Sequence, residues 1–214
     1  MTMRSMTLGL LALTLASACG RNTPRPAARA DAPPCHCSHD ASAPMAANQP
    51  LPDTSVFQMG VPWTDQSGRA FDLASLAGSP TVVLMFYGTC QSTCPLLVRD
   101  VKRVEAALSP AARARTRFLL VTFDPSTDTP ERLSALAAED HLDLSRWTLL
   151  RGADHDIRTF ATVLGVQFSR VGPGEYTHSN LITLLDPQGV VATQLEGLQQ
   201  PVEEFARRIE GYTR

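Results

Sequence analysis

Two cysteines, Cys90 and Cys94, are separated by three residues and lie between an apolar run and a helical pattern. The run from Thr81 to Met85 predicts a fully buried strand, and the residues from Leu96 to Leu108 predict a helix. Pro95 suits the first helical position, because its missing N–H costs nothing there. Unpaired backbone N–H groups and the positive end of the helix dipole stabilise a thiolate at such a position. Thiolates attack disulfides and bind soft metal ions, so the pair indicates a redox or metal site in preference to a structural disulfide.

A histidine, His178, comes just before the apolar segment from Leu181 to Leu185, which predicts a strand. Two thiolates and one imidazole would form a three-ligand site that is soft enough for Cu(I), and the imidazole also makes Cu(II) tolerable. The types of ligand do not identify the metal by themselves, because other divalent ions accept the same donors. A histidine held by backbone contacts is the alternative role for His178.

The remaining segments predict the elements that must position these side chains. A hairpin with Gly68 in its turn comes first, strands and helices then alternate, and a second hairpin and a closing helix follow. This order predicts an α/β fold in which a central mixed β-sheet is flanked by helices, with an added N-terminal β-hairpin. A strand, a loop with two cysteines and a helix form the thioredoxin-like arrangement. The further predicted extended segments are Val61–Thr64, Ala70–Leu73, Arg117–Phe123, Trp147–Leu150, Val166–Val171 and Val190–Leu195, and the further predicted helices are Leu133–Glu139, Asp154–Leu164 and Pro201–Tyr212.

Several motifs occur in a fixed order, at Cys90–Pro95, Val121–Glu131, Gly165-Val166, Thr177-His178-Ser179 and Leu184–Gly189. A dithiol alone is weak evidence, but the dithiol, the Asp-Pro and Asp-Thr-Pro loop, and a histidine before the last hairpin are specific together. In this order the motifs resemble the Sco (SenC) family of copper-handling proteins over most of residues 55–212.

The resemblance implies a thioredoxin-like domain at residues 54–214 with Cys90, Cys94 and His178 as copper ligands. It further implies a metallochaperone rather than an enzyme with turnover. Such a protein would deliver Cu(I) or Cu(II) to the copper-receiving subunit of a respiratory cytochrome oxidase, at its binuclear copper site, or would keep the thiols of that site reduced. Delivery would proceed by ligand exchange through exposed thiolates. Another periplasmic copper carrier or a thiol reductant is a further expected partner.

The sequence departs from the family pattern in two places. Members commonly carry Pro-Asp inside the dithiol loop, where this chain has Gln91 and Ser92, and many carry an acidic residue where this chain has Thr177. A carboxylate beside a ligating imidazole orients the ring and tunes the metal. The departures therefore bear on copper affinity, redox preference and choice of partner.

A thiol–disulfide oxidoreductase of thioredoxin type is the alternative function, because attack and resolution need only Cys90 and Cys94. The wider spacing of the cysteines argues against it, as does His178, which stands where thioredoxins carry a cis-proline. A thiol peroxidase is disfavoured, because Tyr87-Gly88-Thr89 does not supply the threonine and arginine pattern of a peroxide site.

The first residues predict export. Residues 1–18 have a basic residue, an apolar stretch and small residues at the end, which is typical of a signal peptide that is too short to span a membrane. The small residues before Cys19 resemble a bacterial lipoprotein cleavage box, which implies lipid on Cys19 and a tether to the extracytoplasmic or periplasmic face of a membrane. Plain cleavage and an uncleaved anchor are the alternatives. Residues 19–53 are rich in Pro and Ala and predict a flexible linker.

A short cluster lies within this linker, where Cys35, His36, Cys37 and His39 offer four soft or borderline donors. We expect it to be an auxiliary copper site that loads the main one, with an incidental cluster as the alternative. The net charge of −2 gives no reason to expect a nucleic-acid partner.

Three further residues are of types that could serve a site. Asp124 follows a strand at the same edge as the dithiol, and loop geometry before Pro125 is favoured over a contact to the site. His141 and His155 are expected to be surface residues, because nothing in the sequence pairs them with another ligand type.

Overall fold

The structure is a computed structural model that describes residues 50–214. The expected signal peptide at residues 1–18, the lipidation residue Cys19 and the cluster from Cys35 to His39 lie outside the described residues. Among residues 50–214, none of the helices has the length and apolar character that a membrane crossing needs.

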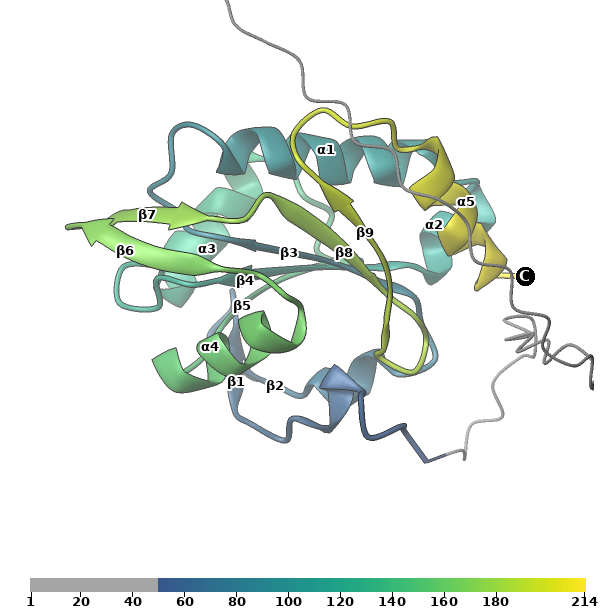
Figure 1. Cartoon of the computed structure of the whole chain (residues 1–214), viewed down its shortest axis with the longest axis horizontal. Coiled ribbons are helices and arrows are strands. Elements are labelled where there is room, and N and C mark those ends of the chain that lie inside the picture. Colours follow the sequence, from purple (N-terminus) through teal and green to yellow (C-terminus); the bar gives the residue numbers. More distant parts are fainter. Residues whose placement is uncertain (1–49) are drawn as a thin grey trace, which may run out of the picture. The chain divides into compact units, whose positions relative to one another are not determined.

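A seven-stranded mixed sheet forms the centre of the fold (Figure 1), and its strand order is β2-β1-β5-β4-β3-β8-β9. The pairs β3–β4 and β4–β5 are parallel, whereas β8, β9, β1 and β2 join antiparallel. The strands are β1 (Trp63–Asp65), β2 (Ala70–Phe71), β3 (Thr81–Phe86), β4 (Arg117–Thr122), β5 (Trp147–Arg151), β8 (Leu181–Leu185) and β9 (Val191–Glu196).

Strand β3 lies inside the sheet, between β4 and β8, and each of its residues is buried, as predicted for a strand that is covered on both faces. Its residue Val82 pairs with Phe118 of β4 on one side and with Leu184 of β8 on the other. Because β4 is parallel to β3, the loops after both strands lie at one edge of the sheet. Because β8 is antiparallel, the residues before it reach the same edge, and His178 is among them.

Helices cover both faces of the sheet (Figure 1). Helix α1 (Cys94–Ala107) contacts α5 (Glu203–Gly211), and α3 (Pro130–Glu139) contacts β5. Helix α4 (Asp154–Val163) lies on the other side, where Phe160 meets Trp63 of β1 edge to face, with ring centroids 5.4 Å apart. The short helices are α2 (Pro110–Arg115) and the 3-10 turns η1 (Val56–Gln58) and η2 (Leu73–Leu76). The predicted α/β fold, with a central mixed sheet, flanking helices and an N-terminal hairpin, is confirmed.

Two helix boundaries differ from the prediction. Helix α1 begins at Cys94, so Pro95 is its second residue and not its first. The helix predicted to end at Leu108 is followed by α2, which was not predicted and which Ser109 caps, since Ala112 donates its N–H to Ser109 Oγ at 3.3 Å.

A second, two-stranded sheet is the larger difference. The segment from Val166 to Val171 was predicted to be extended, and the structure forms β6 (Phe168–Gly172) there and pairs it with β7 (Glu175–His178). The sequence did not predict β7, because Tyr176 is its one large apolar side chain. This hairpin matters because His178 is the last residue of β7.

Candidate metal centre

The segment from Tyr87 to Thr93, here called the dithiol loop, joins β3 to α1. Cys90 lies within it and Cys94 is the first residue of α1, and both are free cysteines. Cys90 is only 9% exposed and Cys94 only 3%. The expectation of exposed thiolates is therefore wrong for this structure, because the loop folds back over the start of the helix and turns both sulfur atoms inward.

The buried carboxylate of Asp128 holds the dithiol loop in place. Gly88 donates its N–H to Asp128 Oδ2 at 2.9 Å, and the Thr122 hydroxyl donates to the same oxygen. A Cβ on Gly88 would lie 2.3 Å from Asp128 Oδ1, so only glycine fits there. Burial raises the pKa of Asp128. The Asp128 side chain thereby ties the loop after β3 to the loop after β4.

The sulfur of Cys90 takes the place of a capping group for α1. Cys94 donates its N–H to Cys90 Sγ at 3.4 Å, and the hydroxyls of Ser92 and Thr93 lie 3.7 and 3.8 Å from the same sulfur. Burial alone would raise the pKa of Cys90. Hydrogen bonds from the N–H groups of Cys94 and Ser92, and from the hydroxyls of Ser92 and Tyr87, outweigh the effect of burial. They lower the pKa of Cys90 to about 5.

The two thiols therefore differ. Burial raises the pKa of Cys94, and the negative charge on Cys90 adds to this effect. At neutral pH the metal-free site holds a thiolate at Cys90 and a thiol at Cys94. The sequence predicted thiolate stabilisation at this helix end, and the structure assigns it to Cys90.

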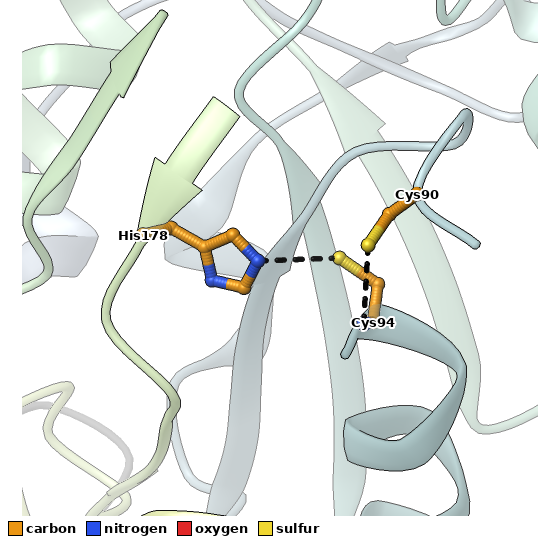
Figure 2. A group of neighbouring side chains, drawn as sticks. All are labelled: Cys90, Cys94 and His178. Carbon is orange, nitrogen blue, oxygen red and sulfur yellow. Dashed lines mark hydrogen bonds between the residues drawn. The ribbon is translucent and has the colours of Figure 1, made fainter. Parts of the chain in front are cut away.

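The imidazole of His178 faces the start of α1 (Figure 2). Its Nε2 lies 3.6 Å from Cys94 Sγ and 3.2 Å from Thr93 Oγ1. Its Nδ1 lies 3.0 Å from the carbonyl oxygen of Ser179, which can only accept a hydrogen bond. In the neutral ring Nδ1 therefore carries the proton, and the Nε2 lone pair points toward the thiols. A backbone carbonyl thus orients this ring, a task that a carboxylate often performs at metal sites.

Aromatic side chains enclose the imidazole. Phe123 and Tyr87 have ring centroids 5.3 and 6.0 Å from that of His178, and Tyr176 packs against both of them. Tyr87 comes from the dithiol loop, Phe123 follows β4 and Tyr176 lies on β7. These contacts hold the His178 ring beside the thiols, while the side chain remains partly exposed.

Cys90, Cys94 and His178 form the one group of three or more ligand-type side chains that is found among residues 50–214, with donor atoms within 4.8 Å of one another. Nitrogen and sulfur donors about 2.0–2.3 Å from a shared ion lie within roughly 4.6 Å of one another. A small inward movement would therefore let the three atoms share one ion. Two sulfur donors and one imidazole favour a soft ion such as Cu(I).

Asp124 contacts the hairpin that carries His178. The carboxylate is 1% exposed, accepts a hydrogen bond from Ser126 Oγ at 2.6 Å, and lies 3.7 Å from the guanidinium of Arg170 on β6. Burial alone would raise the pKa of Asp124, but the hydroxyls of Ser126, Thr127 and Tyr176 and the charge of Arg170 lower it. Within residues 50–214, the loop after β4 thus holds Asp124 through the Ser126 hydroxyl and not through backbone N–H groups to its carboxylate, and the contact with the hairpin adds a link to the site.

The other candidate histidines lie away from this group. His155 is exposed and pairs with Asp156 at 2.9 Å, and His141 is exposed just after α3. The roles of Thr93 and Asp128 were not predicted from the sequence. The sequence indicated only that both are residue types common at helix caps, since Thr93 precedes one predicted helix and Asp128 precedes Thr129 at the start of another.

Comparisons with known proteins extend these observations. The model of the SCO1/SenC family matches residues 54–214. A structure of ScoI from Bradyrhizobium japonicum with copper bound is 24% identical and covers 71% of this chain and 96% of its own, with a TM-score of 0.61. A SCO1/SenC family lipoprotein from Bacillus anthracis is 24% identical and covers 72% of this chain and 92% of its own, with a TM-score of 0.66.

A third structure is that of BsSco, a member of the Sco family of cytochrome c oxidase assembly proteins in which a disulfide switch was identified. It is 21% identical and covers 77% of this chain and 98% of its own, with a TM-score of 0.62. These likenesses confirm the predicted thioredoxin-like fold.

Proposed function

This chain belongs to the SCO1/SenC family, and from that membership we propose that it is an exported metallochaperone that binds copper through Cys90, Cys94 and His178. The main support for this proposal is that the three donor atoms lie within 4.8 Å of one another. The copper-bound ScoI of Bradyrhizobium japonicum supports copper as the metal. Copper is cargo in this role, so the site must both bind and release it.

The asymmetry of the thiols gives an order to binding. The Cys90 thiolate is ready to bind at neutral pH, whereas Cys94 must lose its proton when copper arrives. Release then reverses this order, because a proton returning to Cys94 removes one ligand. Since both thiols are nearly buried, a recipient reaches the metal only after the dithiol loop or the β6–β7 hairpin moves.

The recipient that we propose is the binuclear copper site of a respiratory cytochrome oxidase. BsSco belongs to a family of oxidase assembly proteins, which supports this choice. The lipoprotein of Bacillus anthracis supports a lipid tether at Cys19 after removal of residues 1–18, with residues 19–53 as the linker to the domain at 54–214. The cluster from Cys35 to His39 would then capture copper and pass it to the main site.

Cells provide the test of this function. A strain in which Cys90→Ser and Cys94→Ser replace the native residues should assemble an oxidase that lacks copper at its binuclear centre. A strain with His155→Ala, which changes an exposed histidine away from the site, should assemble the complete centre. Full copper content in the oxidase of the cysteine variant would contradict the proposal.

A thiol–disulfide oxidoreductase is the second candidate, and the different protonation of the two thiols favours it. The Cys90 thiolate would attack a partner disulfide, forming a mixed disulfide and releasing one partner thiolate. Cys94, once deprotonated, would then attack the sulfur of Cys90, forming the Cys90–Cys94 disulfide and releasing the second thiolate. His178→Ala separates the candidates, since copper binding needs the imidazole and this exchange does not.

A further inference from the structure

Thr93 lies at the N-cap of α1, yet its side chain makes no capping hydrogen bond. Threonine at this position commonly accepts a bond from the first turn of the helix. Here Cys90 Sγ accepts from the Cys94 N–H, and the Thr93 hydroxyl is left for another partner. It lies 3.2 Å from His178 Nε2 and 3.8 Å from Cys90 Sγ, so it stands between two of the three donor atoms.

The direction of the bond to His178 follows from the other side of the ring. Nδ1 donates to the carbonyl of Ser179 at 3.0 Å, so Nε2 of the neutral ring can only accept. The Thr93 hydroxyl therefore donates to Nε2. Cys94 Sγ is a second neighbour of Nε2 at 3.6 Å, but a thiol is a weaker donor than a hydroxyl. In the metal-free site, Thr93 occupies the lone pair that a metal would need.

We propose that Thr93 is a positioning residue that passes its hydrogen bond from His178 Nε2 to Cys90 Sγ when copper binds. This inference rests on the proposed copper site. Copper would take the Nε2 lone pair, and the hydroxyl proton would lose its acceptor. Cys90 Sγ is already within the range of a hydrogen bond to sulfur, so rotation about the Cβ–Oγ bond is sufficient.

The exchange has two consequences. Before binding, the hydroxyl holds the imidazole at the start of α1 and so keeps the three donors close together. After binding, a hydrogen bond to the Cys90 sulfur withdraws electron density from the thiolate. Cu(II) depends more on that donation than Cu(I) does, so the bond favours Cu(I). Thr93 would thereby set the preference of the site for one oxidation state without adding a charge.

The test compares three variants of the full chain in a background where Cys19, Cys35 and Cys37 are replaced by Ser, so that Cys90 and Cys94 are the only thiols. Thr93→Val keeps the shape and removes the hydroxyl, and Thr93→Ser keeps the hydroxyl. Ser92→Ala is the matched control, because it removes a hydroxyl that also lies near Cys90 Sγ, at 3.7 Å. The measurements are the ¹⁵N shift of His178 Nε2 without metal, the affinities for Cu(I) and Cu(II), and the sulfur-to-Cu(II) charge-transfer band.

In Thr93→Val, the Nε2 resonance should move to higher ¹⁵N frequency, as expected for a lone pair that has lost its donor. The charge-transfer band should move to lower energy, and the ratio of Cu(II) to Cu(I) affinity should rise about three- to tenfold, the size of one hydrogen bond. Thr93→Ser should resemble the parent. Ser92→Ala should leave the Nε2 resonance unchanged.

Two outcomes would count against these ideas, and they are distinct. If the parent binds copper and Thr93→Val matches it in the Nε2 shift, the band and the affinity ratio, the role of Thr93 is wrong and the copper site stands. If the parent binds no copper, the proposed function is wrong, and the copper-linked role of Thr93 is wrong with it.

Discussion

Cys94 Sγ lies 3.6 Å from His178 Nε2, although the two residues are 84 positions apart in the chain. The topology of the sheet produces this contact. Cys94 follows β3, and His178 precedes β8, which is antiparallel to β3, so both reach the same edge. An imidazole is thereby held against a buried thiol at the start of a helix, which is an arrangement suited to binding a soft metal ion.

The reactivity of Cys90 should show its low pKa. With the pKa at about 5, Cys90 is mostly thiolate one pH unit above that value, so its alkylation rate should be nearly constant from about pH 6 to 9. Burial raises the pKa of Cys94, so its reaction should remain slow across this range. The measurement is the rate of iodoacetamide modification of each cysteine in the reduced, metal-free chain, followed by mass spectrometry. A Cys90 rate that rises throughout this range, as for an ordinary thiol, would contradict the assignment.

Gly88→Ala should destabilise the fold and displace the dithiol loop. The added Cβ would meet Asp128 Oδ1 at 2.3 Å and Leu136 Cδ1 at 2.8 Å, and the Asp128 carboxylate is fixed by its hydrogen bonds to Gly88 and Thr122. Crowding of this kind costs about 1–3 kcal/mol, and copper affinity should fall as the cysteines move. Urea unfolding gives the first quantity. Gly211→Ala is the matched control, because a Cβ added there would meet nothing within 4 Å. It should leave copper affinity unchanged and should not lower stability, since alanine suits the end of α5 at least as well as glycine does.

The linker cluster should add to the copper that the chain carries. Its cysteines and histidines offer soft or borderline donors, so Cys35→Ser with Cys37→Ser should lower the copper stoichiometry per chain. The measurement is the Cu(I) content of the reduced full chain after removal of free metal. An unchanged stoichiometry would exclude the auxiliary site, and the site at Cys90, Cys94 and His178 would not be affected by that result.

Much of this architecture could be predicted because its signals are local. The buried run of β3, the helix after Pro95 and the order of the motifs indicated the fold. That fold places Cys90, Cys94 and His178 at the same edge of the sheet. The roles of Thr93 and Asp128 could not be predicted, because they depend on where each side chain points after folding. The burial of the thiols was also missed, since it depends on the path of the dithiol loop.

The copper affinity of the His178→Ala variant is the decisive measurement for the three-ligand site. The reduced full chain with Cys19, Cys35 and Cys37 replaced by Ser would be titrated with Cu(I) without oxygen, alongside His178→Ala and the control His155→Ala. We predict one tightly bound ion in the parent and in the control. In His178→Ala the affinity should fall by more than about 100-fold, because the loss of a residue that only supports a ligand already costs about 10- to 100-fold. Equal affinity in all three proteins would contradict His178 as a ligand. No tight binding in the parent, together with rapid reduction of a test disulfide, would contradict the copper site and favour the oxidoreductase.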